Sequence, residues 1–465
     1  MEKTKKDDLA SSPLYKEKSA WTFCDTEEEK PRVKAFCDSY LDFLTSCKTE
    51  RETIGFCEKY LREHGFSDDP ASDAYVTTLR GKALFAFRKG TDPLSQGIHL
   101  VAAHADCPRL DFKPQPFIEQ SGFAQAKTHY YGGLRKYQWL ARPLALHGVI
   151  CKDNGEVVSV TLGESPDEPV FTIADLLPHL AQEQVAKTVK EAFEGEKLNV
   201  ILGNKAPEKK EGDKEIPDPV KLAILKLLQQ KYDVKEEDFL SAEIEVVPAG
   251  RASYVGLDSS LIGAYGQDDR ICVYTGLRAL CDSKAAGKNC ALILWDKEEI
   301  GSDGASGASS RFVSYCIEDV LRAHEPQTAL GHVMMASKAL SADVTGGMDP
   351  DYPDTHDKNN VASLGFGPCF EKYTGSGGKY GASEAHAEFF AGLRGLLNSR
   401  SIPWQSGILG KVDHGGGGTV ALFLAQWGMN VIDCGPALLG MHSPFELSSV
   451  ADVYTTYQAY KAFFE

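Results

Sequence analysis

Residues 291–302 read Ala291-Leu292-Ile293-Leu294-Trp295-Asp296-Lys297-Glu298-Glu299-Ile300-Gly301-Ser302. The short apolar run predicts a buried strand, and two adjacent glutamates follow its carboxyl end. Ligands of open α/β sheets bind beyond the carboxyl ends of the strands, so Glu298 and Glu299 fall where chemistry is usually performed. Two ionised carboxylates repel each other, and a pair of metal ions relieves that repulsion. Taken alone, the stretch fits a solvated strand end better, because charged side chains are usually exposed.

Other histidines and carboxylates end apolar stretches or begin helical patterns elsewhere in the chain. They are His104, with Asp106 two residues later, Asp268, Asp343 and His442. Together with Glu298 and Glu299, this set contains only imidazole and carboxylate groups. That mixture suits zinc or manganese ions, and it supplies enough ligands for two ions with a bridging carboxylate. Individually, these residues fit simpler roles as helix caps or surface groups.

Composition limits the classes of function. The chain has 465 residues, 42% hydrophobic and 25% charged, which is enough for a large core and more than one domain. Its net charge of −16 argues against nucleic acid and anionic membranes as partners. We expect no membrane span, because no run of about eighteen apolar residues occurs. The start Met1–Ala10 lacks the apolar region of a secretory signal. The twelve cysteines contain no Cys-x-x-Cys pair, which predicts reduced thiols in a cytoplasmic enzyme.

The pattern changes after the first strands. From 109 to about 252, short alternating segments with turn signals dominate, and Asp153-Asn154-Gly155 predicts a tight two-residue hairpin. Pro219 to Tyr232 then predicts an amphipathic helix. Strand-end chemistry resumes only after this region, so we interpret it as a domain inserted into the first. Near the end of the chain, Gly415 to Gly418 form a tract that allows close approach to a ligand, although a mobile turn fits it equally well.

The motifs together resemble the aspartyl aminopeptidase/aminopeptidase I family of dinuclear zinc metallopeptidases, over nearly the whole chain. The motifs that carry the resemblance, in the family's order and spacing, are His104-Ala105-Asp106-Cys107-Pro108, Gln267-Asp268-Asp269-Arg270, Asp296 to Ser302, Ser341-Ala342-Asp343 and Met441-His442-Ser443. The tract Lys411-Val412-Asp413, running into Gly415 to Thr419, is similar to the aminopeptidase I branch.

The resemblance implies a role for each motif residue. It implies that His104 and Asp343 bind one zinc ion, that Glu299 and His442 bind the other, that Asp268 bridges both, that Glu298 is the general base, and that Asp106 orients His104. It therefore implies two Zn²⁺ ions per subunit, with Co²⁺ or Mn²⁺ as substitutes.

The resemblance also implies an architecture. We expect an α/β fold with a central mixed sheet flanked by helices, as in zinc exopeptidases. Residues 1–107 and 253–465 would form a discontinuous catalytic domain, and residues 108–252 an inserted, mostly-β dimerisation domain. Family members act on peptides and assemble as tetrahedral homododecamers that enclose their active sites, so the same assembly is expected here.

Departures from the acidic-residue-specific branch bear on the substrate. Gly346 and Asp175 stand where that branch has histidines, with His179 the alternative to Asp175, and its lysine corresponds to Glu371 or Lys372. We therefore expect a neutral or apolar N-terminal residue such as leucine. The candidates for substrate contact are Gly417, Gly418, Lys372 and His179.

Three alternative functions remain from the sequence. They are an aspartyl aminopeptidase selective for N-terminal Asp or Glu, a metal-stabilised shell protein with little catalysis, and a small-molecule amidohydrolase. Glu298 argues against a shell protein, because a structural zinc site needs no spare base. The large insertion argues against an amidohydrolase, by resemblance alone.

Overall fold

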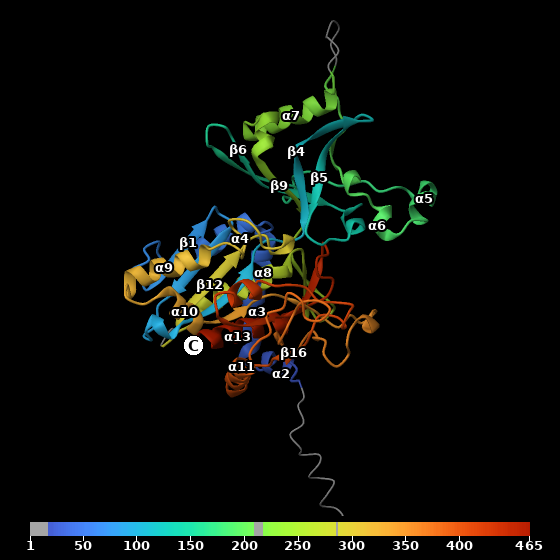
Figure 1. The fold of residues 1–465 in the computed structure, drawn as a ribbon. Helices are drawn as coiled ribbons and strands as arrows, with labels where there is room; N and C mark the ends of the chain where they lie inside the picture. The colour runs from blue at the N-terminus through green and yellow to red at the C-terminus, as the bar shows by residue number, and fades with distance from the viewer. Residues whose placement is uncertain (1–16, 209–216, 285–286) are drawn as a thin grey trace, which may run out of the picture.

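The structure is a computed structural model that describes residues 17–208, 217–284 and 287–465. The charged start Met1–Ala10 therefore lies outside the described residues. Two large sheets organise this part of the chain, one above the other in Figure 1. No helix in the described ranges combines the length and apolarity needed to cross a membrane.

The lower sheet of Figure 1 is mixed and has eight strands, which confirms the predicted α/β class. In spatial order its strands are β1 (Ala74–Leu79), β2 (Ala83–Arg88), β12 (Asn289–Trp295), β3 (Ile98–His104), β13 (Lys338–Ser341), β17 (Asn430–Gly435), β15 (Cys369–Glu371) and β16 (Gln405–Ser406). The four central strands, β12, β3, β13 and β17, run parallel. Every residue of β12 is buried, as the opening stretch predicted. The carboxyl ends of the four parallel strands therefore meet at one edge.

Helices cover both faces of this sheet. The cluster of buried side chains on one face includes residues from α2 (Trp21–Cys24), α3 (Glu29–Ser46), α4 (Glu50–Glu63), α8 (Gln267–Asp282), α11 (Ala387–Ser399) and α13 (Val450–Phe464). The cluster on the other face includes residues from α9 (Phe312–His324), α10 (Leu330–Ala336) and α12 (Ala421–Ala425). Strands buried on both faces read as continuous apolar runs, which is why the central strands were visible in the sequence.

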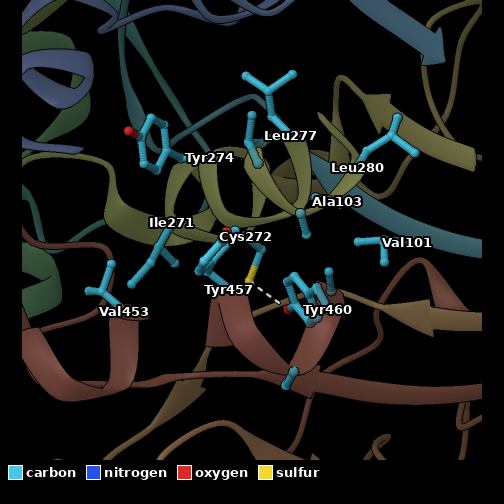
Figure 2. Close-up of a cluster of buried hydrophobic side chains, with 14 of the residues drawn as sticks. Val101, Ala103, Ile271, Cys272, Tyr274, Leu277, Leu280, Val453, Tyr457 and Tyr460 are labelled. Atoms are coloured by element: carbon cyan, nitrogen blue, oxygen red, sulfur yellow. Dashed lines mark hydrogen bonds between the residues drawn. The ribbon is translucent and has the colours of Figure 1, made fainter. Parts of the chain in front are cut away.

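Alternation along β3 divides its side chains between the two cores. Val101 and Ala103 belong to the core that contains α8 and α13, whereas Leu100 and Ala102 belong to the opposite one. Figure 2 shows the first core between β3 and these helices, where the Tyr460 hydroxyl donates a hydrogen bond to the Cys272 sulfur at 3.4 Å. This packing fixes where β3 ends, and hence where His104 lies.

A capping box opens α4. The Thr49 hydroxyl accepts a hydrogen bond from the Glu52 backbone N–H at 3.2 Å, and a Glu52 carboxylate oxygen accepts one from the Thr49 N–H at 3.1 Å. Two otherwise unpaired N–H groups of the first turn are thereby satisfied.

The upper sheet is antiparallel throughout. Its strands, in spatial order, are β7 (Val157–Leu162), β6 (Leu144–Cys151), β9 (Ala242–Pro248), β4 (Arg109–Gln120), β5 (Phe123–Tyr131) and β8 (Val200–Gly203). All six lie within the stretch 108–252 that we expect to be an inserted domain, and that division stays a prediction. Helix α7 (Pro219–Tyr232) has the predicted bounds and packs on this sheet.

The predicted hairpin between β6 and β7 has a longer connection than two residues. Strand pairing stops at Cys151 and Val157, and the Gly155 N–H donates to the Lys152 carbonyl at 3.0 Å. Gly155 has a φ of +87°, so the extra residue is accommodated in a left-handed conformation after the turn.

Smaller elements complete the described chain. A three-stranded sheet contains β10 (Ser253–Val255), β11 (Leu261–Ala264) and β19 (Glu446–Ser449), and a two-stranded sheet contains β14 (Thr345–Gly346) and β18 (Ala437–Leu438). Between β7 and β8, a segment with the short helices α5 (Gln182–Val185) and α6 (Val189–Ala192) projects to the side of the upper sheet in Figure 1. Its apolar side chains include Leu180 and Val185, which are 68% and 81% exposed.

Candidate metal centre

The predicted histidines and carboxylates gather at the carboxyl edge of the mixed sheet. His104 is the last residue of β3, and Asp343 follows β13 by two residues. Glu298 and Glu299 form a 3-10 turn just after β12, and Asp268 stands in the first turn of α8. His442 follows β18 from the far end of the chain. Five separate segments therefore meet at one point, where the sequence placed them.

Asp268 lies between the two histidines. Its Oδ1 is 3.3 Å from Nε2 of His104, and its Oδ2 is 3.1 Å from Nε2 of His442. Asp343 Oδ1 lies 3.8 Å from the same nitrogen of His104, and Glu299 Oε1 lies 3.3 Å from that of His442. Three groups have their ligand atoms within 4.8 Å of one another: His104–Asp268–Asp343, Asp268–Glu299–His442 and His104–Glu298–Glu299. Asp268 links the first two, which between them contain both histidines and Asp343. A carboxylate shared by two ligand groups is the arrangement expected of a bridge between two ions.

The histidine rings present the nitrogen that a metal would need. His104 Nδ1 is 3.0 Å from the backbone carbonyl of Asp106, and His442 Nδ1 is 2.8 Å from that of Gly133. A carbonyl accepts a proton only from a protonated nitrogen, so each neutral ring turns an unprotonated Nε2 toward the cluster.

Buried carboxylate oxygens without hydrogen-bond partners provide a second test of whether the site fits metal ions. Among the described residues, Asp268 Oδ1 and Glu299 Oε1 are buried without a well-aligned hydrogen bond, although each faces a histidine nitrogen at 3.3 Å. An unsatisfied buried carboxylate oxygen is costly. Four carboxylates (Asp268, Glu298, Glu299, Asp343) also outnumber the two histidines. Divalent cations would relieve both deficits, and a set of histidine and carboxylate donors is one that zinc accepts.

Burial and mutual repulsion shift the titration of the cluster. Burial, together with Asp268 and Asp106, raises the pKa of Glu298 to about 7, although His104 opposes the shift. Burial is also the main cause that raises the pKa of Glu299 and of Asp343 well above the ordinary carboxyl range. Divalent cations bound to these carboxylates would oppose the upward shifts, which is a further reason that the cluster favours metal.

Asp106 is fully buried behind His104 and the Glu298–Glu299 turn. Its Oδ1 accepts the Glu298 backbone N–H at 3.1 Å and lies 3.4 Å from Nδ1 of His104. Its Oδ2 accepts the Glu299 N–H at 3.2 Å and the Tyr131 hydroxyl at 2.8 Å. Asp106 thus touches the ring of His104, a metal-ligand candidate, and the backbone of both the proposed base Glu298 and the ligand candidate Glu299.

Sequence reasoning missed three residues that hold this centre. Glu446 accepts the His442 N–H at 2.6 Å and the Asp268 N–H at 3.1 Å, and Gly133 and Tyr131 contact His442 and Asp106 as described. One signal was available in Gly132-Gly133. A Cβ on Gly132 would lie 3.3 Å from Cβ of Glu299, and one on Gly133 would lie 3.4 Å from Nδ1 of His442. Paired glycines after a strand mark this close approach.

A cavity of about 600 Å³ opens over the cluster. Gly417 and Gly418, two candidates for substrate contact, line it, and so do the apolar side chains of Leu409, Leu422 and Phe423. Lys372 is not among the described residues that line it, and its Nζ lies 3.8 Å from a Glu384 carboxylate oxygen instead. His179 lies on the projecting segment, where it lines a separate cavity together with Asp175.

Glu371, the alternative to Lys372, does line the cavity. Its carboxyl group is buried and accepts a hydrogen bond from the Thr345 hydroxyl, and it stands opposite Asp433 in the pairing of β15 with β17. Burial raises the pKa of Glu371 to about 8, which leaves this carboxyl group mostly uncharged near neutrality.

Comparison with known proteins identifies relatives over the whole described fold. A family model described as aminopeptidase I zinc metalloprotease (M18) matches residues 43–464. A relative from Thermotoga maritima, named "Probable M18 family aminopeptidase 1", is 47% identical over 94% of this chain and 97% of its own. The crystal structure of an M18 family aminopeptidase from the same organism superposes with a TM-score of 0.91 at 46% identity, covering 97% of this chain and all of that one. The mApe1 dodecamer of S. cerevisiae shares the fold, with a TM-score of 0.75 at 21% identity over 94% of this chain and 97% of its own.

Proposed function

The chain belongs to the aminopeptidase I zinc metalloprotease (M18) family and is therefore a metal-dependent aminopeptidase, and we propose that it removes neutral or apolar N-terminal residues from peptides with a pair of zinc ions. The observation that carries the two-ion proposal is Asp268, whose two oxygens belong to two separate ligand groups. His104 and Asp343 would hold one ion, and Glu299 and His442 the other. Co²⁺ or Mn²⁺ would substitute, because their preferred donors are the same.

The bound ions would supply Lewis acidity, which lowers the pKa of a water and stabilises charge on the scissile carbonyl. Glu298, at the cavity wall, accepts a proton from the attacking water and returns it to the leaving amine. During these steps Asp106 keeps the ring of His104 and the backbone of the Glu298–Glu299 turn in place. The acidic side chains around the cavity also favour a free substrate α-amino group, which accounts for exopeptidase action.

The cavity wall supports the proposed substrate preference. Leu409, Leu422 and Phe423 offer apolar contacts, and Glu371 is uncharged near neutral pH. Glu371 also brings a carboxyl group where the acidic-residue-specific branch is expected to have a lysine. Where Glu371 is ionised, an N-terminal Asp or Glu would meet its like charge, although Lys379 and Lys411 also line the cavity.

Self-association is part of the proposal. The exposed leucine and valine side chains of the projecting segment are suited to burial against another copy, and the fold is that of the S. cerevisiae dodecamer. We propose that residues 108–252 form the dimer contact, within a tetrahedral homododecamer. A cytoplasmic location fits the twelve cysteines, all of which are free thiols.

A substrate panel tests the proposal. Metal-stripped protein is assayed on aminoacyl substrates with N-terminal Leu, Met, Lys, Asp or Glu, with and without added zinc, cobalt or manganese. We expect metal to restore hydrolysis of the Leu and Met substrates and not of the Asp substrate. An N-acetylated Leu substrate serves as the control, because an aminopeptidase leaves it intact. Metal-restored hydrolysis of Asp and Glu substrates would replace the proposed preference with that of an aspartyl aminopeptidase.

A further inference from the structure

The last residue of β5, Tyr131, touches the metal centre from the upper sheet. We propose that Tyr131 is a positioning residue, which holds Asp106 and through it both His104 and the Glu298–Glu299 turn. The inference rests on the proposed two-metal site. Tyr131 touches neither substrate nor ligand atoms in this account, so its effect is indirect.

The contact between Tyr131 and Asp106 is short and buried. The tyrosine hydroxyl donates to Asp106 Oδ2 at 2.8 Å, and the aspartate is 0% exposed. A buried carboxylate depends on each of its donors, because water cannot replace a lost one. Without the hydroxyl, Oδ2 would retain only the N–H of Glu299, at 3.2 Å.

A loosened Asp106 would affect several atoms of the centre together. Its Oδ1 accepts the Glu298 N–H, its Oδ2 accepts the Glu299 N–H, and its backbone carbonyl faces Nδ1 of His104. The proposed base, one ligand of the second ion and one ligand of the first therefore share this support. Groups that orient metal ligands in this way usually have large effects on metal affinity and rate.

The Tyr131 ring packs against Arg109, which is itself held by ion pairs. Arg109 pairs with Tyr131 across β4 and β5, and its guanidinium carbon lies 3.9 Å from the ring centroid. Asp111 at 2.8 Å and Glu245 at 3.1 Å hold the Arg109 Nε in turn. Glu245 belongs to β9 of the upper sheet, and Glu50 of α4, at 3.6 Å from a terminal nitrogen of Arg109, adds a contact from the helices on the mixed sheet.

Gly133, two residues after Tyr131, contacts the ring of His442 in the second proposed ligand group. The Gly133 carbonyl accepts a hydrogen bond from His442 Nδ1 at 2.8 Å, and Gly132 approaches Glu299. Residues 131–133 thus contact the supports of both ion positions. Tyr130, by contrast, is 45% exposed and its ring lies against Gly195, so it offers a matched control on the same strand.

The test compares Tyr131→Phe with Tyr130→Phe in the full-length protein. Zinc affinity is measured by competition with a chelator, and kcat and KM are measured on a Leu substrate after zinc is restored. For Y131F we expect zinc affinity and kcat each to fall about 10–100-fold, the range typical of groups that orient metal ligands. KM should stay within about twofold, because the cavity wall is unchanged. Y130F should match the wild type in all three quantities.

A second readout separates positioning from general support. Y131F keeps the ring and its packing on Arg109, so the melting temperature of the metal-free protein should stay that of Y130F, whereas the visible absorption of the cobalt-substituted protein should change. Zinc affinity and kcat equal to those of Y130F would overturn the inference, and so would a loss explained entirely by a lower melting temperature of the metal-free protein. Wild-type protein that binds no zinc would overturn the proposed function as well.

Discussion

Two buried clusters in this molecule place a histidine between carboxylates, and they differ in whether the protein itself satisfies those carboxylates. In the metal centre, His104 and His442 contact Asp268, Asp343 and Glu299. In the second cluster, His147 on β6 lies 2.7 Å from Glu52 through Nδ1 and 3.0 Å from Glu164 through Nε2. Lys48 adds an ion pair with Glu164 at 2.5 Å and bonds to the carbonyls of Pro248 and Gly250 at 2.8 Å. The second cluster joins the start of α4 to the upper sheet.

The difference lies in what the protein itself satisfies. Around His147, two groups able to carry positive charge face two carboxylates, and both ring nitrogens have acceptors. In the metal centre, buried carboxylate oxygens lack aligned donors among the described residues, and acids outnumber histidines. Proximity of histidine and acid therefore does not distinguish a metal site from a structural one. The unsatisfied acceptor and the unbalanced charge do.

Removal of metal should produce the largest difference between the two clusters. Dialysis against a chelator should abolish hydrolysis, because the centre depends on ions, and added zinc should restore it. The His147 cluster needs no ion, so the metal-free chain should keep its secondary structure, measured by circular dichroism. A chelator already saturated with zinc is the control. Full activity in protein from which almost all metal has been removed would contradict the account.

The next largest effect is expected for Glu298→Gln, set against Glu299→Gln. Gln cannot accept the proton, so E298Q should lose about 10²–10⁴-fold in kcat. It should keep its zinc and its assembly, because Glu298 is not needed as a ligand. E299Q should lose zinc as well as activity. Zinc content and hydrolysis of the two variants separate the roles, and an active E298Q in a clean preparation would remove the general-base assignment.

The His147 cluster should instead affect stability. Glu164 and Glu52 outweigh the effect of burial and raise the pKa of His147 above 6.5. The resulting stabilisation is therefore fully present below pH 6.5 and lost as the pH rises through the raised value. His147→Asn should lower the free energy of unfolding by about 3 kcal/mol at or below pH 6.5, since one partner of a buried ion pair is removed.

The difference between wild type and H147N should then shrink as the pH rises, while kcat stays close to that of the wild type. Melting curves across pH provide the measurement, with His332→Asn, an exposed histidine on α10, as the control. A destabilisation that is independent of pH would show that the His147 charge contributes nothing.

The smallest effect is expected for Glu371→Gln. Below pH 8 both side chains are uncharged and nearly equal in shape, so kcat/KM for a Leu substrate should change less than about twofold. Above pH 8, wild-type Glu371 becomes ionised and should favour a Lys substrate over Leu, whereas E371Q should show no such trend. The ratio of kcat/KM values for Lys and Leu substrates against pH is the measurement. A trend shared by both variants would assign it to another group.

The sequence predicted those parts of the molecule whose signals are local. The apolar run of β12 and the bounds of α7 depend on neighbouring residues, and the structure confirms them. The ligand candidates were also visible, because each follows an apolar strand or starts a helix. Parallel strands then bring their carboxyl ends to one edge without further information.

The supporting residues could not be predicted in this way. Glu446 is 178 residues from Asp268, and His147 is 95 residues from Glu52, so their contacts exist only after the sheets have packed. Tyr131 and Asp106 are 25 residues apart, and the tyrosine hydroxyl meets the carboxylate only after the two sheets have packed. Tertiary packing likewise decides which buried carboxylates have a hydrogen-bond or ion-pair partner, so the sequence does not reveal it.

The most direct test is the number of zinc ions bound per chain, measured by elemental analysis after equilibrium dialysis, for wild type, Asp268→Asn and H147N. The account predicts two ions for the wild type and for H147N, and fewer than two for D268N, because the two oxygens of Asp268 face the two histidines of the proposed ion positions. Two ions in D268N, or a loss of zinc in H147N equal to that in D268N, would contradict it.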